Sequence, residues 1–196
     1  LYPGANRSLT GEEVVSRLAS TPTPRVLTGQ FEVPLETVRA AFTYGRQIGA
    51  ITMLNPAPAR TLPTELLAIT DILTPNRNEL FQLLGDPIPA NPSTAEIRTA
   101  ARELMRRGAR SIVVTLGADG ALVFEDSEEP EHVPPYSVRP VDTVGAGDAF
   151  NGGLAFRLAQ GASLPEAARF GAACGALATR RVGVIKALPY AHEVEQ

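Results

Sequence analysis

Short apolar strand patterns alternate with amphipathic helix patterns along most of the chain, and this alternation limits the possible folds more than any other feature. Two of the strand patterns, at 51–54 and 111–115, are rich in β-branched residues. Strands that alternate with helices of about 10–15 residues predict an α/β protein with a mostly parallel sheet and helices on both faces. In such sheets ligands bind beyond the carboxyl ends of the strands.

Capping signals and glycines place the helix ends. Thr10, Ser93 and Ser163 are each followed three residues later by Glu, which is the pattern of a capping box. The expected strands are 25–28, 51–54, 71–73, 111–115, 121–124 and one that approaches residue 141 after the acidic stretch 125–135. The expected helices begin at Thr10, at 34 (to 49), 62 (to 68), 76 (to 84), 93 (to 108), 148 (to 160) and 165 (to 180).

Length and composition fit a single globular domain over 1–196. The chain has 196 residues, 44% of them hydrophobic, and a net charge of −3 without an extended basic stripe, so we expect no nucleic-acid partner. No run approaches the roughly 20 apolar residues that span a bilayer, so we expect no membrane partner. The only cysteine, Cys174, lies among small residues and is expected to be buried, in keeping with a reducing cytoplasm.

A glycine-rich string at 142–153 carries the clearest chemistry. The small residues at 145–147 let the main chain approach a ligand closely, and they stand before a predicted helix whose free N–H groups favour an anion. The carboxylate of Asp148 can accept a proton from a nucleophilic hydroxyl at the same place. Together these features indicate a phosphoryl-transfer site. The alternative is a plain glycine turn in which Asp148 caps a helix, and no Walker A motif is present.

The string at 142–153 closely resembles the second signature of the ribokinase (PfkB) family of carbohydrate kinases. Asn6 and the segments 54–59, 74–79 and 115–120 resemble further family segments in the family's order, and the combination is more similar to the ribokinase branch than to the fructokinase or adenosine kinase branches. The resemblance implies a three-layer α/β/α Rossmann-like ribokinase fold, of which this chain is the C-terminal two-thirds, with the N-terminal strands and the lid missing.

The resemblance also implies an activity, the ATP-dependent phosphorylation of D-ribose to D-ribose 5-phosphate. Asp148 would be the catalytic base, and the amides of Gly145, Ala146, Gly147 and Asp148 would form the anion hole. The residues expected at ATP are Asn76, Thr115, Leu116, Gly117, Ala118, Asp119, Gly120, Gly147, Asp148 and Ala172. An alternative for the segment 115–120 is an ordinary connection between two strands.

Two cations follow from the same resemblance. Asn76 and Glu79 match an N-x-x-E element that organises Mg²⁺ through water, although the same pattern is also a good helix cap. A monovalent cation, K⁺, would be bound mainly by main-chain carbonyls. Its expected positions are Asp142, Val144, Ala178, Arg181, Gly183 and Ala187. Ala187 replaces a hydroxyl residue often found in the family, which predicts weaker cation binding.

Glu32 matches a sugar-contacting position and is expected to bind the sugar together with Asp148, although a glutamate before a helix can also serve the helix dipole. His132 and His192 have no ligand-like spacing and are interpreted as surface residues. The expected partners are D-ribose and ATP, and full-length family members are often homodimers. We expect the chain alone to be a poor or inactive kinase. The alternatives to a ribose kinase are another PfkB sugar or nucleoside kinase and a non-catalytic nucleotide-binding remnant.

Overall fold

The computed structural model describes residues 4–195, which divide into two compact units, one ending at Ile112 and one beginning at Val113. Six strands form one sheet in the order β1-β2-β3-β4-β5-β6. The pairs β1–β2, β2–β3 and β3–β4 are parallel, whereas β5 and β6 are antiparallel. This confirms the predicted α/β class with a mostly parallel sheet. The interpretation of residues 1–196 as a single domain stays a prediction.

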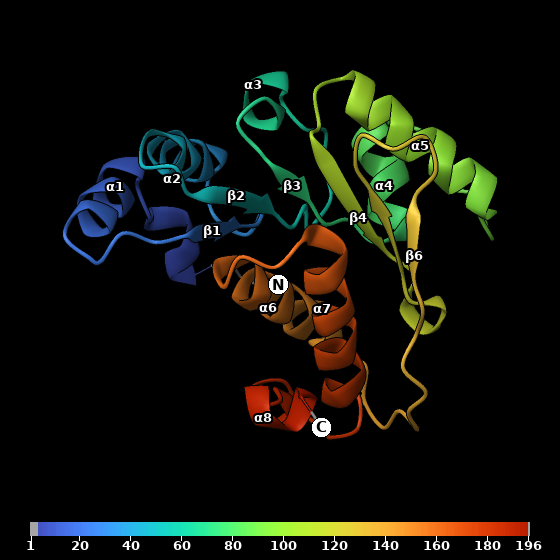
Figure 1. Ribbon diagram of the computed structural model, residues 1–196. Helices are drawn as coiled ribbons and strands as arrows, with labels where there is room; N and C mark the ends of the chain where they lie inside the picture. The colour runs from blue at the N-terminus through green and yellow to red at the C-terminus, as the bar shows by residue number, and fades with distance from the viewer. Residues whose placement is uncertain (1–3, 196) are drawn as a thin grey trace. The chain divides into compact units, whose positions relative to one another are not determined.

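The first unit carries the parallel strands. Its helix α2 packs on β1 and β2 (Figure 1), and its core includes Phe42, Met53 and Leu73, all nearly inaccessible to solvent. Its elements are the 3-10 helix Gly4–Ser8, α1 (Gly11–Ala19), β1 (Val26–Gly29), α2 (Leu35–Gln47), β2 (Ile51–Leu54), α3 (Thr64–Leu67), β3 (Ile72–Leu73), α4 (Arg77–Leu84), α5 (Thr94–Arg106) and the start of β4 (Ser111–Thr115).

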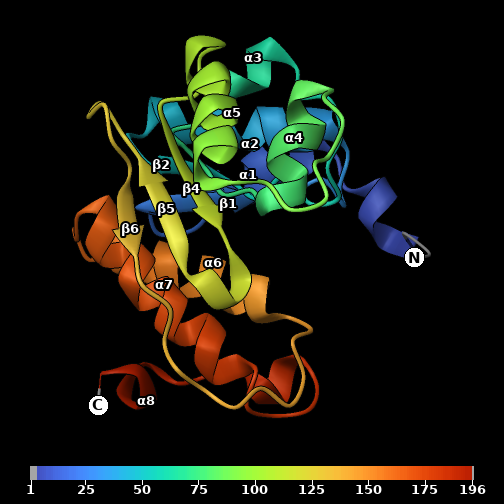
Figure 2. The same cartoon turned by 90° about the vertical axis from the view of Figure 1, so that its right-hand side faces the viewer.

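The second unit holds an antiparallel hairpin and a close helix pair. Helices α6 and α7 lie side by side, and α7 packs on both strands of the hairpin (Figure 2). Its elements are the end of β4, the 3-10 helix Gly117–Asp119, β5 (Ala121–Phe124), β6 (Glu131–Val133), α6 (Ala146–Ala159), α7 (Leu164–Ala178), the 3-10 helix Ile185–Ala187 and α8 (Ala191–Val194).

Helices α6 and α7 approach so closely that there is no room for a side chain at Gly153. A Cβ atom added at Gly153 would stand 2.6 Å from Sγ of Cys174. Cys174 is buried, as predicted, and this burial raises the pKa of its thiol to about 11. The thiol therefore fills space between the helices in its neutral form.

In the first unit, the side chain of Asp71, just before β3, binds the start of the neighbouring strand β2. One of its carboxylate oxygens accepts the main-chain N–H of Thr52 at 2.9 Å, and the other lies 3.2 Å from both Arg46 and Arg110. The side chain of Asp71 is only 22% exposed. A carboxylate at this position satisfies a buried strand amide and is itself balanced by two cations.

The helix starts follow the local sequence signals. All three predicted capping boxes are present, at Thr10, Ser93 and Ser163. Gly85 ends α4 in the left-handed conformation, with φ of 81°, as a glycine in that place predicts. Pro34 is the N-cap of α2 rather than its first residue, a difference of one position.

Two expectations in the second unit are wrong. No strand approaches residue 141, because residues 134–140 have no regular structure; three of them are proline, which has no N–H to donate to a sheet. The last strand instead lies inside the acidic stretch, at Glu131–Val133. In addition, α6 begins at Ala146 rather than at 148, so Asp148 belongs to its first turn. Within residues 4–195, no helix combines the length and the apolar character that crossing a membrane requires.

Candidate active site

The glycine-rich turn forms the N-terminus of α6. Gly145 is the N-cap residue, with φ of 80°, and Ala146, Gly147 and Asp148 are the first three helical residues. The first intrahelical bond runs from Ala149 N to Gly145 O at 2.9 Å. In the part of the chain that the structure describes, the amides of Gly147 and Asp148 have no hydrogen-bond acceptor. Their N–H groups and the helix dipole therefore favour an anion at this point.

Position 145 requires glycine for two reasons, one steric and one conformational. A Cβ atom there would lie 2.8 Å from Cγ1 of Val184, and a side chain at φ of 80° would be strained even in open space. The turn therefore rests directly on the segment that follows α7.

Asp148 is exposed, and its side chain makes no hydrogen bond with any of residues 4–195. Its carboxylate is thus available to accept a proton, one residue from the free amide of Gly147. One turn further on, Asn151 donates from Nδ2 to the carbonyl oxygen of Gly147 at 3.0 Å, while its buried Oδ1 has no partner in the described residues. Sequence reasoning did not single out Asn151, although it follows the glycine turn at one helical turn from Gly147.

Asp142 joins two segments of the predicted cation site. Oδ1 accepts the N–H of Val144 at 3.0 Å, and Oδ2 accepts the N–H of Gly183 at 3.1 Å. These two hydrogen bonds lower the pKa of Asp142. The structure therefore brings together three of the six positions expected at K⁺, namely Asp142, Val144 and Gly183.

The other three positions expected at K⁺ lie at the end of α7 (Ala178) and in the segment after it (Arg181 and Ala187). Arg181 donates its N–H to the carbonyl of Ala178 at 3.4 Å, and its guanidinium binds Glu193 at 2.6 Å, whereas Ala187 is buried. Within the described residues, the carbonyl oxygens of Val144, Arg181, Gly183 and Ala187 accept no main-chain hydrogen bond. Unpaired carbonyls beside a carboxylate are the donor set that a weakly hydrated cation requires. No cluster of His, Cys, Asp and Glu suited to a metal occurs in residues 4–195.

The predicted nucleotide turn follows β4. Leu116 N donates to Gly120 O at 2.8 Å, so the turn closes on itself, and Gly117, Ala118 and Asp119 are exposed at its tip. Gly120 has φ of 85° and ψ of −129°, a conformation that favours glycine. Ala172, expected at the adenine, is a half-exposed residue of α7 in the same unit.

Three candidate residues belong to the first unit. Asn76 and Glu79 form a capping box at the start of α4: Glu79 N donates to Oδ1 of Asn76 at 2.9 Å, and Asn76 N donates to Oε2 of Glu79 at 2.8 Å. Burial raises the pKa of Glu79, and the bond from Asn76 opposes part of this rise. Glu32 lies in the exposed turn between β1 and α2, where its N–H donates to Oε1 of Gln30 at 2.7 Å.

Comparison with known proteins identifies the class. The family model described as pfkB family carbohydrate kinase matches residues 1–191, and the chain belongs to this family. Ribokinase of Staphylococcus aureus is 32% identical over 197 residues, which is 100% of this chain and 64% of the relative. Deoxyribokinase of Salmonella typhi is 38% identical over 168 residues, which is 85% of this chain and 54% of the relative.

Among solved structures, the chain is similar to Arabidopsis thaliana ribokinase complexed with ribose and ATP. The TM-score is 0.83 at 28% identity, and the match covers 94% of this chain and 57% of that one. The chain thus spans less than two-thirds of the length of these relatives.

Proposed function

We propose that the protein phosphorylates D-ribose with ATP to give D-ribose 5-phosphate and ADP. The single observation that carries this proposal is the exposed carboxylate of Asp148 in the first turn of α6, next to the amides of Gly147 and Asp148, which have no acceptor within residues 4–195. A proton acceptor beside donors for a negatively charged group is what transfer of a phosphoryl group to an alcohol requires. Similarity to ribokinases supports ribose as the acceptor.

The reaction follows from this arrangement. Asp148 takes the proton from the primary hydroxyl of the sugar, and the hydroxyl oxygen attacks the γ-phosphorus of ATP. A new P–O bond forms to the sugar while the bond between the γ-phosphorus and the bridging oxygen breaks, and that electron pair leaves with ADP. The amides at residues 145–148 would stabilise the negative charge on the transferring group, so that catalysis rests on positioning and electrostatics. Among the described residues those of Gly147 and Asp148 have no acceptor, whereas the amide of Ala146 donates to Thr143 O at 3.3 Å.

The nucleotide would be held by the turn 115–120, with Ala172 against the adenine and Asn76 near the phosphates. Exposed main-chain groups at Gly117 and Ala118 suit a ligand that is bound chiefly by the backbone. Glu32 would bind sugar hydroxyls, as its exposed carboxylate permits.

The residues present suit both expected cations. Oε1 of Glu79 takes no part in the capping box, and a carboxylate oxygen is a ligand that Mg²⁺ and its water shell prefer. Mg²⁺, when bound, would neutralise phosphate charge. Asp142 and the unpaired carbonyls of Val144 and Gly183 would hold K⁺ beside the N-terminus of α6.

A second candidate acceptor is 2-deoxyribose, because the deoxyribokinase of Salmonella typhi is the more identical of the two curated relatives described above. The two sugars differ by one hydroxyl, so discrimination depends on whether a side chain such as Glu32 binds it. Comparing kcat/KM for ribose, 2-deoxyribose, fructose and adenosine would separate these possibilities.

Asp148→Asn provides the direct test of the chemistry. We expect kcat to fall by roughly 10²- to 10⁴-fold, the usual contribution of a general base, while the Kd for ATP changes little. Asp126→Asn, at an exposed aspartate in the loop between β5 and β6, is the matched control and should retain full turnover. Unchanged turnover in Asp148→Asn would eliminate the proposed base.

A further inference from the structure

Strand β6 and the residues after it pack directly against the turn at 117–120. A Cβ atom added at Gly120 would clash with the carbonyl oxygen of Val133 and stand 2.9 Å from N of Pro135. Val133 is itself fully buried, and it pairs with Ala121 directly after the turn. The main chain of the turn is therefore in contact with β6, with no space between them for a side chain.

His132 adds a side-chain bond to this contact. Its Nε2 atom lies 3.0 Å from the carbonyl oxygen of Asp119, the last residue of the 3-10 helix Gly117–Asp119. A carbonyl oxygen only accepts hydrogen bonds, so Nε2 must carry the hydrogen. The bond holds the carbonyl side of the peptide group between Asp119 and Gly120, whose N–H donates to Gly117 O at 3.2 Å inside the turn.

The bond joins the turn before β5 to the returning strand of the same hairpin, 13 residues further along the chain. Asp119 stands before β5, whereas His132 lies on the returning strand β6, opposite Leu122. Strand β6 is further connected to α7 through Glu131 and Arg169, whose charged atoms lie 3.0 Å apart. Because α7 also carries Ala172, β6 contacts two of the three segments of this unit that are expected at the nucleotide, the third being the start of α6.

We propose that His132 is a positioning residue for the nucleotide: by donating to the Asp119 carbonyl it holds the turn Gly117–Gly120 in the conformation that binds ATP. This inference rests on the proposed function, since it takes the turn to be part of the ATP site. In this role His132 contacts the turn and not the reacting atoms. Its loss should therefore weaken nucleotide binding without slowing the chemical step.

The experiment compares wild type with His132→Ala and His132→Gln, and measures Kd for ATP by calorimetry together with kcat and KM. Removing one hydrogen bond should raise Kd and KM for ATP about 3- to 10-fold, with kcat within about twofold. The amide nitrogen of glutamine can take the place of Nε2, so His132→Gln should recover most of the affinity. Hydrogen exchange at the amides of Asp119 and Gly120 should accelerate in His132→Ala only.

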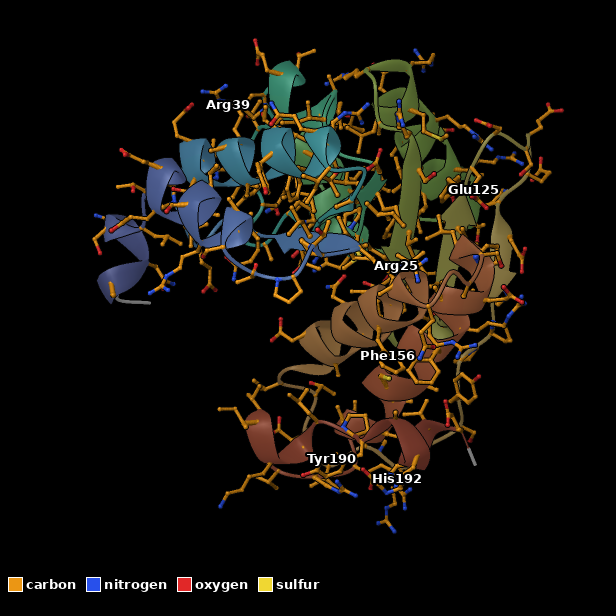
Figure 3. All side chains as sticks on the ribbon, turned by 60° about the vertical axis from the view of Figure 1, so that its left-hand side comes forward. Arg25, Arg39, Glu125, Phe156, Tyr190 and His192 are labelled. Carbon is orange, nitrogen blue, oxygen red and sulfur yellow. The ribbon has the colours of Figure 1, made fainter. Side chains whose placement is uncertain are left out.

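His192→Ala is the matched control. His192 is also exposed, and it stacks on Tyr190 at the start of α8, away from the turn in the sequence (Figure 3). We expect this variant to bind ATP as the wild type does. A thermal melt of each variant establishes that the differences do not come from partial unfolding.

The outcomes separate the two proposals. If the wild-type protein binds no ATP, the proposed function is wrong and the role of His132 fails with it. If the wild type binds ATP and His132→Ala binds it equally well, only the role of His132 is wrong. A His132→Gln variant as weak as His132→Ala would overturn the hydrogen bond as the cause.

Discussion

Oδ2 of Asp142 accepts the main-chain N–H of Gly183 at 3.1 Å, across 41 residues of sequence. Oδ1 of the same carboxylate accepts the N–H of Val144, just before the turn that begins α6. One side chain thus joins the entrance of α6 to the segment after α7. The orientation of the carbonyls at Val144 and Gly183, which we propose as cation ligands, depends on this link.

Replacing Asp142 with alanine should affect both stability and cation dependence. The two N–H donors lower the pKa of Asp142, so the charged form stabilises the folded state above the ordinary value of 3.8, and this stability is lost as the pH falls through the lowered pKa. We expect Asp142→Ala to have a lower Tm than wild type at pH 7 and a smaller difference near pH 3. The K⁺ concentration for half-maximal activity should rise several-fold.

Thermal melts from pH 3 to pH 8 and K⁺ titrations of turnover check this prediction, with Asp126→Ala as the control for loss of one exposed charge. A constant Tm difference at every pH would show that the Asp142 charge is not the cause.

Glu79 and Glu96 occupy the same position of two capping boxes but have different surroundings. Burial raises the pKa of Glu79, whereas the hydroxyl of Ser93 lowers the pKa of Glu96. A raised carboxyl pKa means that the folded state loses stability as the pH rises from the unfolded value through the folded one. Glutamine preserves a capping box.

We therefore expect Glu79→Gln to be at least as stable as wild type at pH 7 but to need more Mg²⁺ for half-maximal turnover. Glu96→Gln should be slightly less stable, with an unchanged Mg²⁺ requirement. Denaturant titrations and Mg²⁺ dependence of turnover measure both. Equal Mg²⁺ requirements in all three proteins would contradict the assignment of Glu79.

Neighbouring glycines in α6 should respond in opposite ways to alanine. A Cβ atom at Gly152 would meet no atom of residues 4–195 within 4 Å, so Gly152→Ala should stabilise the protein by about 0.5–1 kcal/mol through helix propensity. A Cβ atom at Gly153 would stand 2.6 Å from Sγ of Cys174, so Gly153→Ala should destabilise it by about 1–3 kcal/mol. Chemical denaturation measures both; a stabilising Gly153→Ala would refute the close packing of α6 and α7.

Asp71→Ala should destabilise the first unit by roughly 2 kcal/mol, because it leaves the buried N–H of Thr52 without an acceptor and removes the partner of Arg46 and Arg110. Asp86→Ala, at an exposed residue after α4, is the control and should change the free energy of unfolding by less than about 0.5 kcal/mol. Urea titrations followed by circular dichroism would distinguish the two variants.

Sequence signals placed the three helix starts with capping boxes correctly, because the hydrogen bonds of a capping box are local. Each predicted capping box joins residues three positions apart, and the three are present at Thr10, Ser93 and Ser163. The last strand was misplaced because short exposed strands have a weak pattern of their own. Residues 131–133 pair with β5 through the hairpin, and this pairing rather than their composition makes them a strand.

The sequence by itself determined the α/β class, the helix starts that carry capping boxes and the glycine-rich turn, since these depend on periodicity and on contacts between near neighbours. Only the tertiary structure showed that Asp142 binds Gly183 and that His132 binds the carbonyl of Asp119. It also placed Asp148 in the first turn of α6 rather than at its entrance. These bonds join residues that the chain brings together only when it folds, so no local pattern encodes them.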